Sequence, residues 1–559
     1  MSLATIGLIF IVLLILGYNI YGRFLARQFA LDDKNITPAH KLKDGHNFVP
    51  TRPFYLFAQH FSAIAAAGPI AGPIMACMIW GWLPCLVWIA FGVVLIGAVH
   101  DFSSLTASVR HNAVSIAQIA RIHIGERAGI AMMVFIWLAL AYVIVAFTDI
   151  TAGSFVGISE ELMGTDLFFN PGGAVAMAAT LYLVLSLVMG LFEKAFKPPL
   201  WLTTSIFVPL AFLTVYLGTR YSTFLVFDLK YWCVFIIIYC VISSLLPVWL
   251  LLQPRGYLGG FFLYAVISIG VLGIFVGNFE IKQEAFKTWN SGASAGSLFP
   301  FLFVTIACGA CSGFHGLVCS GTTSKQIDRE SHMHAVGYGT MLCEAFVAVI
   351  ALATIMIFAP ADIAGLKPGT IYGKGIGEFL SILVGKEHLA LATTFGAMAF
   401  STFVFDTLDV STRLGRYLLQ ELFGWRSALS SLCTTLLTAL LPLGLILLAQ
   451  EGGYLQFWTL FGAANQLLAA LSLLSISMWL YQRRMRLAFT LIPMFFVLTI
   501  TLWALTDIAV TNWQKAELGV SLVNSFVAAL LIMLALYLVV SAFFRLRLQE
   551  PTAAPKLME

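Results

Sequence analysis

The chain has 559 residues, of which 60% are hydrophobic and only 10% carry a charged side chain. Soluble domains have roughly 25% charged residues, and a fold in water cannot hide so much apolar surface. The composition therefore excludes a soluble protein and predicts an integral membrane protein. The net charge of +4 and the scattered basic residues give no indication of nucleic-acid binding.

The apolar segments are long and continuous, which predicts α-helices and not the alternating strands of a membrane barrel. A helical span requires about 20 apolar residues. Fifteen segments meet this requirement: 3–22, 57–80, 82–104, 129–157, 173–192, 199–218, 231–252, 258–277, 298–322, 335–358, 388–408, 428–449, 454–480, 486–507 and 519–544. The first has no small-residue cleavage site, so we interpret it as a retained helix.

Basic residues test this count because Lys and Arg favour cytoplasmic loops. With the N-terminus outside, 23 of the 31 Lys and Arg residues fall on cytoplasmic loops or on the C-terminal tail. A wrong helix count would scramble this separation partway along the chain. The sequence therefore predicts a multi-pass protein of the cytoplasmic (inner) membrane, with its N-terminus outside and its C-terminus inside.

Two of the predicted spans are interrupted by residues that break helices. Proline removes a backbone donor and clashes with the preceding turn, and glycine weakens the helix further. Such breaks expose backbone groups that bind solutes in transporters, although close helix packing is an alternative explanation. The resulting substrate-binding candidates are Ser62, Gly68, Pro69, Gly72 and Pro73 in the second span, and Ser312, Gly313 and His315 in the ninth.

The interrupted spans are seven helices apart, so they cross the membrane in opposite directions. The fourth and eleventh spans echo each other at the same offset, with Thr148-Asp149 in one and Asp406-Thr407 in the other. This pattern indicates an inverted repeat. We predict an N-terminal helix and basic loop, a first five-helix repeat, a linking helix pair, an inverted second repeat and a C-terminal pair with a tail, at residues 1–56, 57–218, 231–277, 298–480 and 486–559.

Ionisable residues within spans are costly and usually functional, so they are candidates for ion or proton coupling. Asp149 and Asp406 have no basic residue within one turn of their own helices, whereas Asp101 has an alternative role as the partner of Arg110. Asp409 lies four residues before Arg413, which permits a simple ion pair. The coupling candidates are Asp406, Asp149, Thr402, Thr407, Asp101, His100, Glu344 and Asp409.

Other polar residues within the spans have more ordinary explanations. Asn465 and Gln466 are expected to form hydrogen bonds between helices. The spacing of Cys308, Cys311 and His315 has a loose similarity to a metal site, with His60 or His100 as further ligands. The surrounding glycine and serine residues suit a broken helix better, so we predict no bound metal and no cofactor.

Several long strings, in order from residue 60 to about 470, resemble the carbon starvation protein A family of peptide and pyruvate transporters. They are His60-Phe-Ser-Ala-Ile-Ala, Gly68-Pro-Ile-Ala-Gly-Pro73, Trp80-Gly-Trp-Leu-Pro84, Gly97-Ala-Val-His100-Asp101-Phe, Leu252-Gln-Pro-Arg255-Gly-Tyr-Leu, Gly309-Ala-Cys-Ser-Gly-Phe-His315, Ser320-Gly-Thr-Thr-Ser-Lys325, Tyr338-Gly-Thr-Met-Leu-Cys-Glu344, Thr407-Leu-Asp409 with Arg413, and Phe461-Gly-Ala-Ala-Asn465-Gln466-Leu-Leu-Ala. The chain departs from the family at Gln59, where a second histidine is common, and at Gly256, where aspartate is common. It is also shorter than well-known members.

The resemblance implies a LeuT-like fold with two inverted five-helix repeats, in agreement with the pattern of interrupted spans. In transporters of that type a cation lies between the first broken helix and the eighth core helix. By resemblance, the best coupling site here is Asp406 with Ser401, Thr402 and Thr407.

The sequence therefore predicts a secondary transporter that takes up a small pyruvate-like carboxylate, an amino acid or a short peptide together with H⁺ or Na⁺. No Walker-type phosphate loop is present, so ATP is not the expected driver. A membrane sensor for such a nutrient and an intramembrane metal-binding enzyme remain alternatives. The expected partners are the small solute, the ion and the lipid bilayer. The sequence does not determine an oligomeric state.

Overall fold

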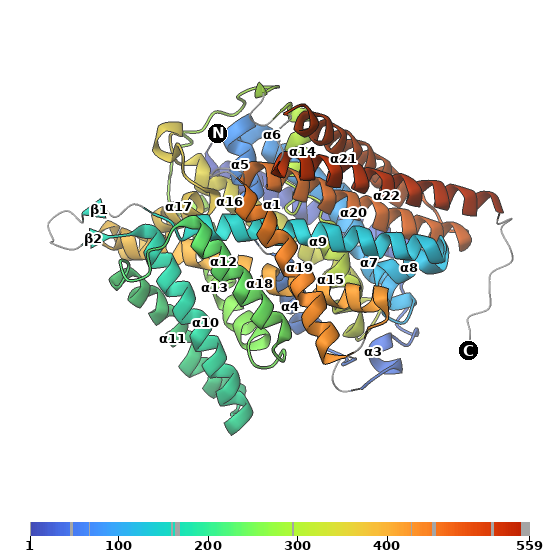
Figure 1. Cartoon of the computed structure of the whole chain (residues 1–559), viewed down its shortest axis with the longest axis horizontal. Helices are drawn as coiled ribbons and strands as arrows, with labels where there is room; N and C mark the ends of the chain where they lie inside the picture. Colours follow the sequence, from blue (N-terminus) through green and yellow to red (C-terminus); the bar gives the residue numbers. More distant parts are fainter. Residues whose placement is uncertain are drawn as a thin grey trace.

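The computed structural model describes residues 2–44, 48–65, 67–157, 160–161, 168–292, 296–425, 427–449, 454–515 and 519–548. Ala66 of the first interrupted span and two of the counted basic residues, Arg426 and Lys556, lie outside these ranges. The described chain is almost entirely helical (Figure 1). Its one named sheet is the two-stranded pair β1 (Glu160–Glu161) and β2 (Phe168–Phe169). The predicted all-α membrane fold is confirmed.

Twelve helical spans in the described residues are long and apolar enough to cross a bilayer, and all of them were predicted. Their helices are α1 (Leu3–Leu16) with α2 (Arg23–Gln28), α6 (Trp82–Gly92) with α7 (Ala98–Arg110), α9 (Glu126–Ser154), α10 (Pro171–Phe196), α11 (Leu200–Arg220), α13 (Leu252–Val276), α16 (Thr340–Met356), α18 (Leu389–Phe423), α19 (Ala428–Leu448), α20 (Tyr454–Gln482), α21 (Ala488–Gln514) and α22 (Val520–Leu548). Turns of π-helix at Gly17–Gly22, Val93–Gly97 and His334–Gly339 continue three of these spans without interruption.

The other three predicted segments are also helical, but each differs from a regular span. The second consists of α4 (Pro53–Ile64) and α5 (Gly68–Trp80), which are bent by 44° from one another. The ninth consists of α14 (Leu298–Thr305) and α15 (Gly313–Gly321), with seven non-helical residues between them. The seventh is α12 (Leu229–Leu245), a 17-residue helix. Both expected helix breaks are therefore present.

Shorter helical segments of the described chain lie between the spans: α3 (Pro38–Lys41), α8 (Ile116–His123), α17 (Pro368–Val384) and the 3₁₀ turns Thr323–Lys325, Pro360–Ile363 and Lys386–His388. Helix α17, which packs along α18, was not predicted. Its five glycine and proline residues and its single lysine, Lys374, conceal the apolar face that the helix buries. Two predicted boundaries were also wrong. Arg255 lies inside α13 and not in a loop, and α18 extends 15 residues beyond the predicted end at 408.

Contacts between loops test the prediction that successive loops lie on opposite sides of the membrane. Residues 29–52 contact residues 326–332, and His123 contacts Gln482, so loops predicted to be cytoplasmic lie together. On the other side, Lys287 bonds to the Met78 carbonyl oxygen and Gln283 to that of Phe358, although far apart in sequence. This grouping agrees with the predicted parity of the spans. Which side faces the cytoplasm stays a prediction.

Helix packing is reciprocal between the two predicted repeats. Helix α5 packs against α16, and its counterpart α15 packs against α7. Helix α9 packs against α19 and α20, whereas its counterpart α18 packs against α10 and α11. The short helices α8 and α17 precede α9 and α18 and contact α15 and α5, respectively. This arrangement is what a LeuT-like pair of inverted units requires, while the repeat boundaries themselves stay a prediction.

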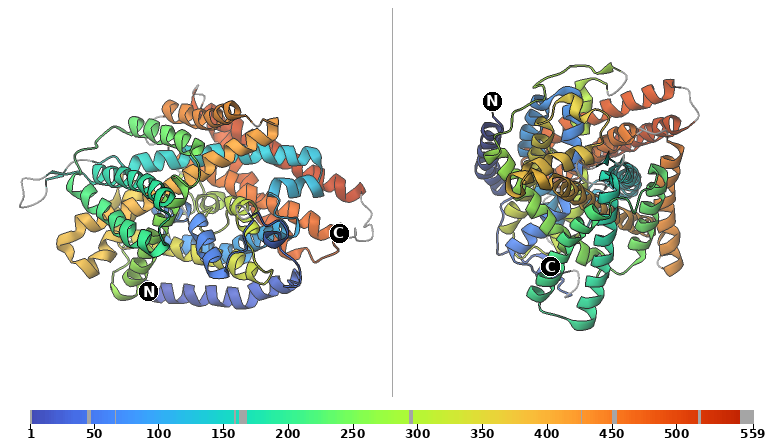
Figure 2. Two further views of the ribbon diagram at one scale, coloured as in Figure 1. Left: turned by 90° about the horizontal axis from the view of Figure 1, so that it is seen from below. Right: turned by 90° about the vertical axis from the view of Figure 1, so that its left-hand side faces the viewer.

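Several helices lie at the periphery of the molecule. Helix α1 runs along one edge of the molecule in both views of Figure 2. Helices α10 and α11 form a hairpin that projects at one end in Figure 1. The spans formed by α1, α11 and α22 are the least buried, as expected for helices that face lipid. The two broken helices therefore lie within the protein and not at its lipid-facing edge.

Candidate functional site

The structure brings the two helix breaks into direct contact. A Cβ atom on Gly68, the first residue of α5, would lie 2.4 Å from the Cys308 sulfur. A Cβ atom on Gly72 would lie 2.6 Å from the Thr305 carbonyl oxygen at the end of α14. Glycine at these positions therefore allows α5 to approach the break between α14 and α15. Both predicted substrate-binding segments contribute to one junction.

Side chains from neighbouring helices satisfy the backbone groups that the second break exposes. Three carbonyl groups near the end of α14 accept hydrogen bonds: Ile306 from the indole of Trp88 at 3.1 Å, Thr305 from the indole of Trp458 at 3.0 Å, and Phe303 from the amide of Gln466 at 2.8 Å. Unpaired carbonyl groups in hydrocarbon would cost several kcal/mol each. These contacts allow the break to exist within the membrane.

The N-terminus of α15 is also occupied. The Phe314 backbone amide donates to Asn465 Oδ1 at 2.9 Å, and Asn465 Nδ2 donates to Ser312 Oγ at 3.0 Å. The predicted interhelical bonding of Asn465 and Gln466 is therefore confirmed. In this conformation the N-terminus of α15, which lies in the predicted substrate-binding segment, is capped by the amide of Asn465.

A buried cluster of carboxylates and imidazoles joins α15 to α7 and α16. His315 Nδ1 lies 2.9 Å from Asp101 Oδ2, and His315 Nε2 lies 3.3 Å from Glu344 Oε2. His100 Nδ1 lies 2.8 Å from the other Asp101 oxygen. All four side chains are at most 1% exposed. We call Asp101, His100, His315 and Glu344 the His315 cluster. It combines one predicted substrate residue with three predicted coupling residues.

The His315 cluster has more polar atoms than it satisfies. Within the described chain, His100 Nε2 and both Glu344 carboxylate oxygens have no hydrogen-bond partner, although Glu344 is in ionic contact with His315. With both carboxylates ionised and His315 protonated, the cluster carries one excess negative charge in a region of low dielectric. Binding one proton would neutralise it.

One simple explanation of Asp101 was wrong. Arg110 does not pair with Asp101 but donates to both carboxylate oxygens of Glu330, at 3.0 and 3.1 Å. Nine residues of α7 separate Asp101 from Arg110, which is about 13 Å along a helix. Asp101 therefore lies deep in the span, whereas Arg110 lies at the end of α7.

The loose metal-like spacing does not form a metal site in this structure. Asn465 and Ser312 bond to Cys308, while both ring nitrogens of His315 face carboxylates. No group of three or more His, Cys, Asp or Glu residues in the described ranges is arranged to hold a metal ion. In this structure Cys308 and His315 are therefore engaged by the groups of neighbouring helices.

A second buried cluster surrounds Arg255 of α13. Arg255 Nε donates to Asp406 Oδ1 at 2.9 Å, and its Nη1 forms an ion pair with Asp409 of the same helix, α18. The Tyr239 hydroxyl of α12 donates to Asp409 at 2.8 Å, and that of Tyr182 to the Arg255 carbonyl oxygen at 2.6 Å. We call these five residues the Arg255 cluster.

The Arg255 cluster corrects the interpretation of Asp409. Its partner is Arg255 and not Arg413, which donates instead to the carbonyl oxygens of Ser243 and Leu246. Asp406, which has no basic neighbour on its own helix, is paired across helices and is 22% exposed. Thr402, Thr407 and Ser401 donate to backbone carbonyls one turn earlier in α18: those of Met398, Phe403 and Ala397.

Asp149 lies apart from both clusters on α9. It is 8% exposed. Lys367, which precedes α17, contacts α9 at Gly153, one turn after Asp149. A Cβ atom on Gly153 would lie 2.4 Å from the ammonium nitrogen of Lys367. A basic residue far away in sequence therefore approaches the carboxylate that has none nearby on its own helix.

Comparison with known proteins decides the family. The family model for "Carbon starvation protein CstA" matches residues 2–374 and 366–504. The chain belongs to the CstA family. It is 30% identical to the peptide transporter CstA of Bacillus subtilis over 97% of this chain and 96% of that protein. It is 32% identical to the pyruvate/proton symporter BtsT of Escherichia coli over 88% of this chain and 79% of that protein.

Solved transporters also align with this CstA-family chain. An Eremococcus coleocola manganese transporter covers 90% of this chain and 99% of its own, with 14% identity and a TM-score of 0.45. MhsT in complex with L-phenylalanine covers 88% of this chain and 99% of its own, with the same identity and TM-score.

Two segments and one helix end contact each other on the predicted cytoplasmic side of the CstA-family chain. The 29–52 segment, which precedes α4, lies against residues 323–333, which follow α15. Ser331 donates from its backbone amide to Asp33 at 2.8 Å, and Arg110 pairs with Glu330. We call this contact between residues 29–52, residues 323–333 and Arg110 the loop latch. It was not predicted, because the partners in these two pairs are 298 and 220 residues apart in the sequence.

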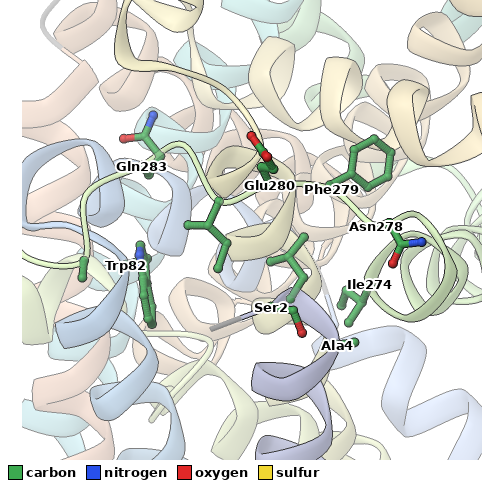
Figure 3. A pocket seen from close by; sticks show the side chains of 11 residues that line it. Ser2, Ala4, Trp82, Ile274, Asn278, Phe279, Glu280 and Gln283 are labelled. Carbon is green, nitrogen blue, oxygen red and sulfur yellow. The ribbon is translucent and has the colours of Figure 1, made fainter.

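A pocket of about 600 Å³ opens on the opposite side of the CstA-family chain (Figure 3). The start of α1, Trp82 and residues 278–285 line it, and Glu280 and Gln283 supply polar groups. It does not touch either helix break.

Ser62 of the predicted substrate site is half-buried on α4.

Proposed function

We propose that this CstA-family protein is a proton-coupled secondary transporter that takes up a small carboxylate or a short peptide. The observation that carries the proposal is the His315 cluster, in which two buried carboxylates share one imidazole beside a broken helix. The relatives named above as a peptide transporter and a pyruvate/proton symporter support the same class of function. The proposed orientation places the N-terminus outside, in the cytoplasmic membrane.

The proton has a physical reason to bind at the His315 cluster. A buried charge without compensation is costly, and the cluster contains two carboxylates for one imidazolium. Glu344, whose two oxygens lack hydrogen-bond partners in the described chain, is the group that we propose takes up the proton. Na⁺ is less suited to the site, because imidazole nitrogens are poor ligands for hard cations, which prefer oxygen.

The substrate site that we propose is the junction of the two breaks. It comprises Ser62, Gly68, Pro69, Gly72 and Pro73 on one side, and Ser312, Gly313 and His315 on the other. The N-terminus of α15 suits a carboxylate, because its backbone amides and helix dipole favour negative charge. Asn465 occupies that terminus here, so a substrate carboxylate would bind by displacing its side-chain oxygen.

The cluster links substrate and proton through one residue. His315 lies in the first turn of α15 and contacts both carboxylates of the cluster. A change in the position of α15 on substrate binding would therefore alter the site of the proton. The coupling role predicted for Asp406, Thr402, Thr407, Asp409 and Asp149 stays a prediction. We favour the His315 cluster because Arg255 already compensates Asp406.

Uptake into proteoliposomes tests the proposal. We expect labelled pyruvate or labelled dialanine to accumulate when the lumen is alkaline, and a Na⁺ gradient at equal pH to have no such effect. A protonophore abolishes accumulation if the proposal is right. Absence of gradient-driven uptake of either compound by folded protein would falsify proton-coupled transport of these solutes. Accumulation driven by Na⁺ alone would contradict the choice of ion.

A further inference from the structure

We propose that His60 relays the proton between the His315 cluster and the predicted cytoplasmic side. The proposal rests on proton-coupled transport, because a relay is needed only if a proton is carried. His60 lies on α4, the first half of the first broken helix, and is 1% exposed. It belongs to neither cluster, and the predicted substrate site does not include it.

His60 lies close to the His315 cluster. Its Nε2 atom lies 3.7 Å from the sulfur of Cys319, which follows His315 by one turn of α15. Residues four apart share a helix face, with about 5–6 Å between their Cβ atoms. The neutral thiol of Cys319 therefore lies between His60 and the turn of α15 that carries His315.

The other ring nitrogen of His60 points towards the loop latch. His60 Nδ1 lies 2.8 Å from the hydroxyl of Thr323, in the 3₁₀ turn after α15. Thr323 is buried, whereas the preceding residue Thr322 is exposed. The Thr323 carbonyl accepts from Gln326, whose own carbonyl accepts from Thr51 of the latch. The chain therefore passes from buried to exposed within one residue of the hydroxyl that His60 contacts.

This position matches the chemistry of a relay. A neutral imidazole binds a proton at one ring nitrogen and releases one from the other, so it passes a proton without a net change. A proton leaving Glu344 or His315 crosses one turn through a bridging water and is taken up at His60 Nε2. The Nδ1 proton then passes to the Thr323 hydroxyl, whose own proton goes to water. Tautomerisation restores the ring.

A buried histidine with only a structural role explains less of this arrangement. For hydrogen bonding alone, one ring nitrogen on Thr323 is sufficient, and an amide would serve equally. The second nitrogen faces the weakly polar thiol of Cys319 on the side of the cluster. One nitrogen towards the buried acids and one towards the exposed end is the orientation that a relay requires.

Comparison of net uptake with exchange tests the relay. Exchange of labelled for unlabelled substrate at equal pH moves no net proton, whereas accumulation in a pH gradient must load and release protons. We expect His60→Gln to lower gradient-driven accumulation about tenfold or more. Exchange is expected to remain within about twofold of wild type, because Gln retains volume and a hydrogen bond to Thr323. The substrate is whichever of pyruvate and dialanine the wild type transports.

Two further variants complete the test. Thr323→Val breaks the bond to Nδ1 and is expected to reduce accumulation less than His60→Gln, again with exchange preserved. Gln59→Ala changes the exposed neighbour and serves as the matched control, with both activities unchanged. Full accumulation by folded His60→Gln would overturn the relay, and so would equal loss of exchange and accumulation. If the wild type itself fails to accumulate substrate in a pH gradient, the proposed function fails instead.

Discussion

The His315 cluster and the Arg255 cluster share a plan but differ in their central cation. In each, one basic side chain lies between two carboxylates: His315 between Asp101 and Glu344, and Arg255 between Asp406 and Asp409. A guanidinium group stays protonated in proteins, whereas an imidazole exchanges protons near neutral pH. The same arrangement therefore holds a permanent cation in one place and an exchangeable cation, our proposed proton site, in the other.

The two clusters also differ in whether the helices that they join are continuous or broken. Arg255 connects uninterrupted helices, α13 and α18, and Tyr239 adds α12. His315 lies on α15, half of a broken helix, whose backbone groups are satisfied by side chains and not by the next turn. A helix end held in this way can be released without breaking a helix. The comparison therefore separates a connection between continuous helices from one that involves a broken helix.

The largest expected effect follows removal of the exchangeable cation. His315→Gln keeps a donor near Glu344 but cannot carry a positive charge or bind and release protons. We expect proton-driven accumulation to fall about 100-fold or more. Uptake of labelled substrate into proteoliposomes, with folding checked by gel filtration, measures this. Wild-type accumulation by the variant would remove the distinction between the clusters.

The next effect concerns stability and not coupling. Arg255→Gln leaves two buried carboxylates without their cation, and breaking a buried pair costs about 3–5 kcal/mol. We expect a large fall in the thermal unfolding midpoint in detergent. Adding Asp409→Asn is expected to recover part of the loss, because it removes one uncompensated charge. An unchanged midpoint would show that the Arg255 cluster does not hold α13 to α18.

A pair of matched substitutions compares one carboxylate in each cluster. Glu344→Gln is expected to flatten the pH dependence of uptake, because it removes the proposed proton acceptor and keeps the shape. Asp406→Asn is expected to retain that pH dependence, since Arg255 stays paired with Asp409. Initial uptake rates measured from pH 5 to 8 compare the two. The reverse result would return proton coupling to Asp406, as the resemblance implied.

A smaller effect is expected at the loop latch, which is closer to water. Arg110 is 22% exposed, so its pair with Glu330 is partly screened by solvent. Glu330→Gln is expected to change the uptake rate severalfold in either direction without abolishing accumulation. The same proteoliposome assay measures it, and loss of all uptake would show that the pair has a larger role than closing one side.

The smallest effect concerns Asp33 in the latch. Hydrogen bonding from the Ser331 backbone amide lowers the pKa of the exposed Asp33 carboxyl below its ordinary value. A carboxyl with a lowered folded-state pKa stabilises its contact above the unfolded pKa, and the contribution is lost as the pH falls through the folded pKa. Asp33→Asn is therefore expected to increase trypsin cleavage of the 29–52 segment at neutral pH. A variant as resistant as wild type would exclude a role for this carboxylate.

Much of the fold follows from local properties of the chain. Continuous apolar runs, the alternation of basic loops and the Gly-Pro pairs of the second span are each read within about 25 residues. Such patterns predict spans and breaks because the bilayer requires each backbone group to be satisfied within its own helix or by a nearby cap. The glycine residues Gly68 and Gly72 were predicted to matter for the break, and they form the surface on which it packs.

The partners of charged residues did not follow from the sequence. Asp101 and Asp409 have basic neighbours in sequence, yet both pair with residues more than 150 positions away. Sequence spacing identifies neighbours on one helix, whereas these ion pairs join different helices. Pro254 near the start of α13 is the one local sign that Arg255 lies within a helix, because proline is favoured in the first turn.

By itself, the sequence determined that this protein is a multi-pass helical membrane protein with two interrupted spans and a set of buried acids. Tertiary structure alone decided which acid shares an imidazole and which shares a guanidinium. Hydrophobicity acts along each helix and is written in consecutive residues. Pairing of buried charges depends on how helices pack, so it is not written in consecutive residues and only the folded chain shows it.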